Sequence, residues 1–193
     1  YSFTDRGDRQ LSLKPEGTAG VIRSFIENKM YADTQPTKLY YITPCFRYER
    51  PQAGRQRQFH KFGIEVLGSD GPSVDAEVIS LAVQFFNEMG LKNLSVNINS
   101  VGCPTCREEY NRKLKEYLDK KVDVLCETCL ERKDKNPMRV IDCKNPHCKE
   151  NLQDIPFMID HLCEGCKDHF DKLQTYLKEM DINYVVDKTI VRG

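Results

Sequence analysis

Cysteine spacing is the feature that most restricts how this chain can fold. Eight of its nine cysteines form four close pairs: Cys103/Cys106, Cys126/Cys129, Cys143/Cys148 and Cys163/Cys166. A Cys-x-x-Cys turn delivers two thiolates at once, and a tetrahedral zinc ion takes four. The pairs could therefore supply two Cys₄ sites, although spacing does not show which pair joins which. The alternative is eight reduced thiols in a fold that needs no metal.

Charge and hydropathy exclude several classes of protein. Lys plus Arg and Asp plus Glu each number 29, so there is no general basic field for nucleic acid and any polyanion site must be local. The sequence has no apolar run of transmembrane length and no charged-then-apolar leader. We therefore expect a cytoplasmic protein with no membrane partner, in which paired cysteines indicate metal binding before disulfides. The ninth cysteine, Cys45, lies in an apolar strand and is predicted to be a small buried hydrophobe.

The pattern along the chain predicts an α+β domain interrupted by a helical insertion. Residues 1–102 combine strand-like and helical segments, residues 103–182 are helical, polar and rich in paired cysteines, and residues 183–193 return to a strand pattern. Because the chain starts at Tyr1 and stops soon after a strand, we also expect it to be a fragment of a longer protein.

Within the first segment, the sequence predicts a small hairpin, a helix and a longer hairpin. Residues 1–14 alternate loosely around an Arg-Gly-Asp turn, and Thr18 is a plausible N-cap for a helix that runs to Met30. Residues 37–50 and 58–68 are rich in β-branched and aromatic side chains, so they predict two antiparallel strands.

The loop between these two strands concentrates basic charge. Arg47, Arg50, Arg55 and Arg57 surround a Pro and a Gly, and the returning strand carries Glu65 in an apolar setting, where a carboxylate needs a partner. A guanidinium matches a phosphate with two parallel hydrogen bonds. The residues therefore suggest a nucleotide site, and the alternative is a solvated hairpin tip.

Several segments resemble a known enzyme family. "FRYERPQAGRQRQFHKFGIEVLG" resembles motif 2 of class II aminoacyl-tRNA synthetases, and "LSLKPEGTAG", "NPMRVIDCKN" and "IVRG" are similar, in this order, to segments of the histidyl-tRNA synthetase family. The resemblance implies an antiparallel sheet flanked by helices and interrupted by a helical insertion near the acceptor arm of tRNA. It also implies activation of histidine with ATP and Mg²⁺, followed by transfer to tRNA(His).

The resemblance implies roles in ATP binding for one group of residues. Arg47 matches the motif 2 arginine that binds the α-phosphate, and Arg192 matches an arginine that lies against the same phosphate; both are expected to be catalytic. Glu49 is expected near the adenine amino group, Arg55 near the outer phosphates, and Phe59 stacked on adenine.

A second group is implied to bind histidine. Glu16, Gly17 and Thr18 match the segment that holds the α-amino group, and Glu65 matches the position that reads the imidazole, where an acid suits a ring N–H donor. Lys61 stands where the family usually has a glutamine that contacts the amino group. A cation there would repel an ammonium, so Lys61 is expected to turn toward Glu65 or solvent if it does not contact the substrate.

The resemblance also sets the expected partners and the competing interpretations. Family members are homodimers, but motifs 1 and 3 are absent here, so we expect little activity from this piece alone. One alternative is a non-catalytic, regulatory paralogue from histidine biosynthesis, which generally lacks both the "PEGTAG" run and the insertion. A second is a zinc-knuckle RNA-binding module, which leaves the arginine loop and Glu65 unexplained.

Overall fold

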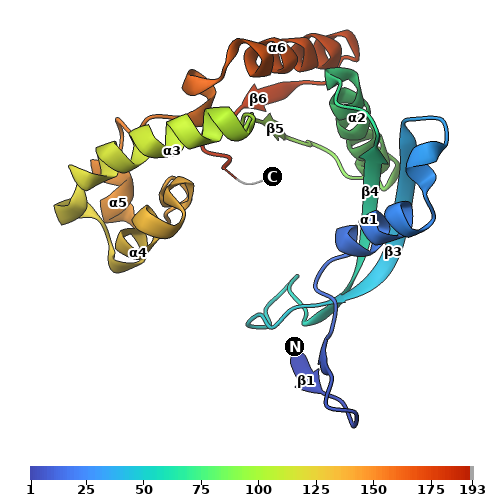
Figure 1. Cartoon of the computed structure of the whole chain (residues 1–193). Coiled ribbons are helices and arrows are strands. Elements are labelled where there is room, and N and C mark those ends of the chain that lie inside the picture. The colour runs from blue at the N-terminus through green and yellow to red at the C-terminus, as the bar shows by residue number, and fades with distance from the viewer. Residues whose placement is uncertain (192–193) are drawn as a thin grey trace. The chain divides into compact units, whose positions relative to one another are not determined.

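Residues 1–191 are described by a computed structural model, in which the chain forms two units, Tyr1–Asp70 and Gly71–Gly193 (Figure 1). Both helices and strands occur in each unit, as an α+β fold requires. The division at residues 102 and 182 stays a prediction, because packing alone does not show where one domain is inserted into another. Within the described residues, every helix is too short or too polar to span a bilayer.

The first unit opens with a small hairpin, as the sequence predicted. Strands β1 (Ser2–Thr4) and β2 (Gln10–Ser12) pair antiparallel. The Asp5 carboxylate accepts hydrogen bonds from the backbone N–H groups of Gly7 and Arg9, at 2.8 and 3.0 Å. An Asp at this position therefore closes the turn with its own side chain.

A longer antiparallel hairpin follows and confirms the predicted pair of strands. Strands β3 (Thr37–Phe46) and β4 (Gln58–Leu67) are in continuous register, from Thr37 opposite Leu67 to Phe46 opposite Gln58. The first strand ends earlier than the predicted residue 50. Beyond Phe46 the chain enters the arginine-rich loop, which folds back at Gly54, a residue with a φ of 74°.

The alternation of side chains along β3 and β4 builds one partly buried face. Its members are Leu39, Tyr41, Thr43, Cys45, Phe59, Lys61, Gly63 and Glu65. Cys45 is fully buried on this face, which confirms its prediction as a small hydrophobe. Because Tyr41, Thr43, Lys61 and Glu65 bring polar groups to this face, it can bind a polar ligand and is not a purely hydrophobic core.

Helix α1 (Thr18–Glu27) begins with Gly17 as its N-cap, so the predicted N-cap role of Thr18 is wrong. The Glu16 carboxylate instead accepts the N–H groups of Gly17 and Thr18, at 2.8 and 3.2 Å. The Thr18 hydroxyl is thereby free to donate to Glu65. A short 3₁₀ turn, Met30–Ala32, follows the helix.

The second unit packs two long helices around a parallel strand pair. Helix α2 (Pro72–Glu88) contacts α6 (Glu164–Glu179), and β5 (Val96–Ile98) pairs parallel with β6 (Tyr184–Val186). Their core consists of Ala76, Ile98, Phe170, Leu173 and Leu177. Segments nearly a hundred positions apart in the sequence therefore share one core, and most of the cysteine-rich segment lies between them in the sequence.

Besides α6, the described part of the cysteine-rich segment contains the helices α3 (Pro104–Asp119), α4 (Glu127–Lys135) and α5 (Pro146–Asn151). Short 3₁₀ turns join them at Val122–Val124, Pro137–Val140 and Met158–His161. Its buried cluster consists of Cys106, Tyr110, Leu114, Leu118, Leu125, Cys129, Met138, Val140, Cys143, Cys148, Leu152, Ile155 and Met158. Cysteines therefore make up about a third of this core.

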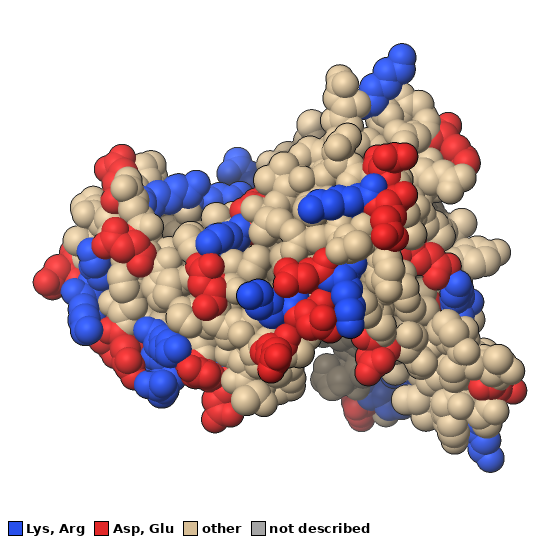
Figure 2. Space-filling model, turned by 90° about the horizontal axis from the view of Figure 1, so that it is seen from above, with Lys and Arg blue, Asp and Glu red and all other residues tan. Residues whose placement is uncertain are grey.

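Surface charge follows the neutral composition. On the face drawn in Figure 2, Lys and Arg side chains lie among Asp and Glu side chains, and neither sign forms a continuous area. Any site for a polyanion on this face must therefore be local.

Candidate functional site

The Glu16 carboxylate is the centre of a charged group on the partly buried hairpin face. Lys61 donates to both of its oxygens at 2.8 Å, and Arg47 Nη2 lies 3.6 Å from Oε2. The hydroxyl of Tyr41 also donates to Oε1, at 3.3 Å. The Lys61 hydrogen bond is the main reason why the pKa of Glu16 falls to about 2. Glu16 is therefore a carboxylate at any physiological pH, and it already has a cationic partner.

Glu65 lies beside this group and is joined to it by a threonine. Thr18 Oγ1 is 2.6 Å from Glu65 Oε1 and 3.2 Å from Glu16 Oε1. One hydroxyl proton cannot serve both carboxylates, and the shorter distance assigns it to Glu65. The arrangement places two carboxylates on one face, the first paired with cations and the second held by a neutral donor.

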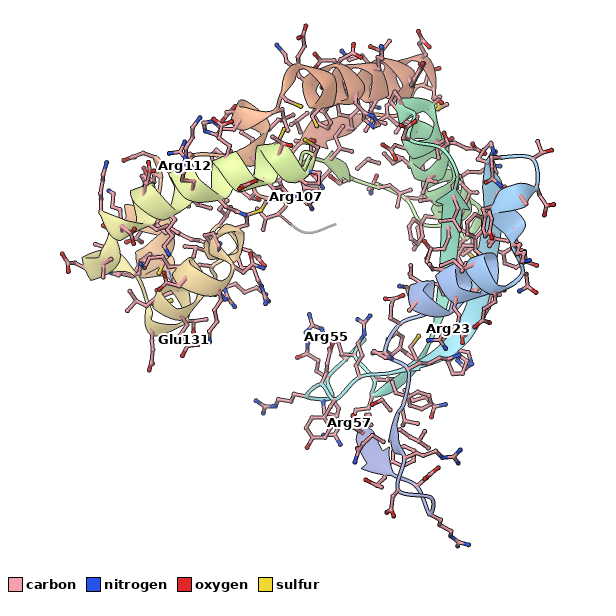
Figure 3. All side chains as sticks on the ribbon, viewed as in Figure 1. Arg23, Arg55, Arg57, Arg107, Arg112 and Glu131 are labelled. Atoms are coloured by element: carbon pink, nitrogen blue, oxygen red, sulfur yellow. The ribbon has the colours of Figure 1, made fainter. Side chains whose placement is uncertain are left out.

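The arginine-rich loop between β3 and β4 adjoins the same face. The Arg47 guanidinium lies 5.3 Å from the centre of the Phe59 ring, and its Nε donates to the Pro15 carbonyl at 3.2 Å. Arg55 Nη1 is 3.9 Å from Glu49 Oε2, and Figure 3 shows Arg55 and Arg57 projecting from the loop. The loop thus presents guanidinium groups and one aromatic ring, which suit phosphates and a flat base.

Tyr41 organises this face and was missed by the sequence reasoning. Its ring occupies the space over two glycines: a Cβ added at Gly17 or at Gly63 would lie 2.2 Å from a ring carbon. Gly63 is directly opposite Tyr41 in the register of the hairpin. Both glycines are therefore required by the close approach of the Tyr41 ring, whose hydroxyl reaches Glu16. Only the strand register, which the sequence did not specify, reveals this contact.

Replacing Gly63 by alanine tests this packing. In Gly63→Ala the new methyl group must displace the Tyr41 ring, so we expect about 1–3 kcal/mol of destabilisation, as overpacking usually costs. The matched control is Gly20→Ala in α1, where an added Cβ meets nothing within 4 Å. That substitution should stabilise the chain by about 0.5–1 kcal/mol. Urea denaturation measures the change in the free energy of unfolding for both variants, and hydrogen exchange of the β4 amides shows whether the effect of Gly63→Ala lies in the hairpin. Equal effects of the two substitutions would contradict the proposed contact.

The eight paired cysteines come together as two groups of four. Cys103 and Cys106 join Cys163 and Cys166, while Cys126 and Cys129 join Cys143 and Cys148; within each group all Sγ atoms lie within 4.8 Å of one another. We call these the outer and the inner tetrad, since the outer tetrad joins the two ends of the segment. Among the described residues, both tetrads are complete without a histidine. Either group could hold a metal ion.

Backbone hydrogen bonds adapt several thiols to a thiolate state. The first cysteines of three pairs, Cys103, Cys126 and Cys163, are the N-caps of α3, α4 and α6. The N–H of Cys106 is the main reason why the pKa of Cys103 falls to about 6, and that of Cys129 lowers the pKa of Cys126 to about 7. Burial instead raises the pKa of Cys129, and it raises the pKa of Cys166 to about 12. Some thiols of each tetrad therefore favour the thiolate and others the neutral form. A bound cation would favour the thiolate at all of them.

Comparison with known sequences decides the family. The sequence model described as "Histidyl-tRNA synthetase" matches residues 1–139, which include the β3–β4 hairpin, the arginine loop and the first part of the cysteine-rich segment. The chain belongs to the histidyl-tRNA synthetase family.

Individual relatives support this family membership. The chain is 77% identical over 193 residues to a histidine–tRNA ligase of Clostridioides difficile (strain 630), covering 100% of this chain and 46% of that protein. It is 56% identical over 194 residues to a histidine–tRNA ligase of Clostridium perfringens (strain SM101), covering 100% of this chain and 47% of that protein. The chain therefore spans about half the length of the curated relatives that it matches.

A solved structure of the family confirms the predicted fold class. The crystal structure of apo Staphylococcus aureus histidyl-tRNA synthetase matches with a TM-score of 0.78 at 39% identity, covering 100% of this chain and 45% of that chain. The antiparallel hairpin and its flanking helices thus belong to the α+β, class II synthetase fold of this family.

The structure brings most of the predicted site residues to one place. Glu16, Gly17, Thr18, Lys61 and Glu65 lie together with Arg47 and Phe59 on or beside one face of the hairpin. Glu49 and Arg55 form a separate pair within the loop. Lys61 turns toward Glu16 rather than toward Glu65 or solvent. The remaining candidate, Arg192, lies outside the described residues.

Proposed function

We propose that this chain is part of a histidine–tRNA ligase, which activates histidine with ATP and transfers it to the 3′ end of tRNA(His). Family membership supports this proposal, and the observation that carries it is the group around Glu16 and Glu65. Two carboxylates with different partners lie next to an arginine loop, so one face offers sites for an ammonium, an imidazole and phosphates.

In the proposed reaction each part of histidine has a chemical counterpart. Glu16, with Thr18, takes the α-ammonium, and Glu65 accepts the imidazole N–H. The substrate carboxylate is already a nucleophile, so no strong base is required. It attacks the α-phosphorus in line, so that a carboxylate O–P bond forms, giving a mixed anhydride, while the bond from the α-phosphorus to pyrophosphate breaks. The ribose hydroxyl of the tRNA end then attacks the carbonyl carbon, and AMP leaves.

Arginines supply the electrostatic part of this mechanism. Arg47 takes the α-phosphate, Arg55 the outer phosphates, Phe59 stacks on adenine, and Glu49 accepts from the adenine amino group. Arg192 is proposed to lie against the α-phosphate. Mg²⁺, bound with ATP, adds neutralisation of phosphate charge. From the family we also propose a homodimer for the full-length protein and a cytoplasmic site of action.

The alternatives of a regulatory paralogue and of an RNA-binding module are less well supported. A protein that only binds nucleic acid has no use for two partnered carboxylates on a hairpin face. A paralogue without catalysis has no need for Arg47 between Glu16 and Phe59. The relatives compared above carry the name of the ligase.

The test uses the full-length ligase, meaning this sequence within a chain of its relatives' length. We expect histidine-dependent exchange of pyrophosphate into ATP. Glu65→Gln should raise KM for histidine much more than KM for ATP, because it replaces an acceptor of the imidazole N–H. Glu88→Gln, at the end of α2, is the matched control and should change neither KM. A similar change of both KM values in Glu65→Gln would assign Glu65 to the scaffold.

We also propose that both tetrads hold structural zinc. The Sγ–Sγ distances of 3.5 Å for Cys103–Cys106 and 3.8 Å for Cys126–Cys143 are close to the roughly 3.8 Å edge of a Zn–thiolate tetrahedron. Backbone N–H groups of Cys126 and Cys163 donate to the sulfurs of Cys148 and Cys106, both at 3.1 Å, as in the outer shell of metal sites. Four thiolates leave no position for water, so the ions would have no part in the reaction.

A further inference from the structure

Lys61 holds the carboxylate that the substrate's ammonium is proposed to take. It donates to both oxygens of Glu16 and also interacts with the Tyr41 hydroxyl, and about a third of each of the Lys61 and Glu16 side chains is exposed. An α-ammonium can therefore reach Glu16 only by separating this pair. The separated Lys61 then needs another anion, because a partly buried charge without a partner is costly.

The surroundings of Lys61 increase that need. Arg47 Nη2 also faces Glu16, at 3.6 Å, and Lys14 donates to Thr43, which is directly opposite Lys61 in the hairpin. Two cations, Lys61 and Arg47, thus border one carboxylate, and a third, Lys14, contacts the residue opposite Lys61. Once Glu16 is occupied by an ammonium, the cations on this side of the face lack a counter-charge, and Glu65 is held by Thr18.

An α-amino acid supplies both missing charges, since one carbon carries its ammonium and its carboxylate. We propose that Lys61 moves from Glu16 to the α-carboxylate of the substrate, so that one internal ion pair is exchanged for two pairs with the zwitterion. This inference rests on the proposed function of the site. The flexible four-carbon stem of lysine, with its charge at the tip, allows such a movement.

Because of this exchange, the site binds a ligand tightly only if the ligand has an α-carboxylate as well as an ammonium. An amine without a carboxylate must leave Lys61 without a partner, whereas a zwitterion does not. Lys61 is therefore a specificity residue, which excludes decarboxylated amines that otherwise fit the ammonium and imidazole positions. It also brings the nucleophilic carboxylate toward Arg47, which is proposed to hold the α-phosphate that the carboxylate attacks.

The test compares binding of histidine and histamine, which lacks the carboxylate, to the full-length ligase by calorimetry. The measured quantity is the ratio of the Kd for histamine to the Kd for histidine. In Lys61→Met this ratio should fall by roughly ten- to a hundredfold, as expected when one charge-assisted hydrogen bond is lost. Histamine itself should bind more tightly than to the wild type, because Glu16 loses its nearest competing cation.

Two further variants separate charge from shape and from general damage. Lys61→Arg keeps the charge and should retain the ratio within about threefold. Lys172→Met removes a lysine–carboxylate pair on the surface of α6 and should leave the ratio unchanged. An unchanged ratio in Lys61→Met, or an equal fall in Lys61→Arg, would overturn the exchange. If the wild-type ligase activates histidine but the Lys61 variants give either of these ratios, this inference alone is overturned. A wild-type ligase that does not bind histidine overturns the proposed function and this inference together.

Discussion

Removal of zinc is expected to unfold residues 103–182 while the β3–β4 hairpin stays folded. The protein purified without added zinc should carry about two equivalents of the metal. In zinc-finger peptides the bound ion contributes about 10–16 kcal/mol to folding, far more than a small core supplies. The buried cluster of the segment consists in part of the thiols themselves, so the metal-free form loses core as well as ligands. Circular dichroism and metal analysis during chelation measure both changes.

Cysteine variants test the pairing as well as the metal. Cys129→Ala should lose one equivalent of zinc, and a second substitution at Cys148, in the same tetrad, should lose no more. A second substitution at Cys106, in the outer tetrad, should remove the other equivalent. Cys45→Ala is the matched control, because Cys45 and Cys129 are both fully buried but only Cys129 belongs to a tetrad.

Two results would contradict the zinc proposal or the assignment of the tetrads. Less than about a tenth of an equivalent of zinc, with eight freely titrating thiols and no change in helicity on chelation, would show that the tetrads are buried thiols. Loss of both equivalents in the Cys129/Cys148 double variant would contradict the assignment of these two residues to one site.

Loss of the Arg47 guanidinium is expected to slow histidine activation by a factor of about a hundred to a thousand. Arg47→Ala in the full-length ligase should cost about 3–4 kcal/mol of transition-state stabilisation, by analogy with loss of one oxyanion donor. Arg47→Lys should not restore the rate, because an ammonium cannot bind a phosphate with two parallel hydrogen bonds. Pyrophosphate exchange at saturating histidine is the measurement.

The matched control lies in the same loop. Arg50 is exposed, and Arg50→Ala removes the same charge from the hairpin while leaving the residue between Glu16 and Phe59 in place. We expect it to change the exchange rate by less than about threefold, as exposed surface substitutions usually do. Near-normal exchange by Arg47→Ala, or equal losses in the two variants, would remove Arg47 from the proposed α-phosphate site.

Local sequence patterns determined much of this site. The strand pattern of residues 58–68 predicted the returning strand of the hairpin, and the side chains of Lys61 and Glu65 share a face because side chains alternate along any strand. The "PEGTAG" run and the arginine loop supplied the family. The four cysteine pairs pointed to metal ligands, since a short spacing fixes which two thiols act together.

Contacts between distant segments were decided only by the tertiary structure. The outer tetrad depends on the approach of the N-terminus of α6 to that of α3, which lies sixty residues earlier, and no local pattern encodes that approach. The same holds for Lys61, which pairs with Glu16 across 45 positions of sequence, and for Tyr41, whose place over Gly63 depends on register. At Thr18 a local preference for capping the helix competes with a hydrogen bond to a distant residue. Its sequence context favours a helix cap, but the hydroxyl bonds Glu65 because Glu16 already accepts the helix N–H groups. Short-range preferences are small in energy, and a partly buried carboxylate that needs a donor outweighs them.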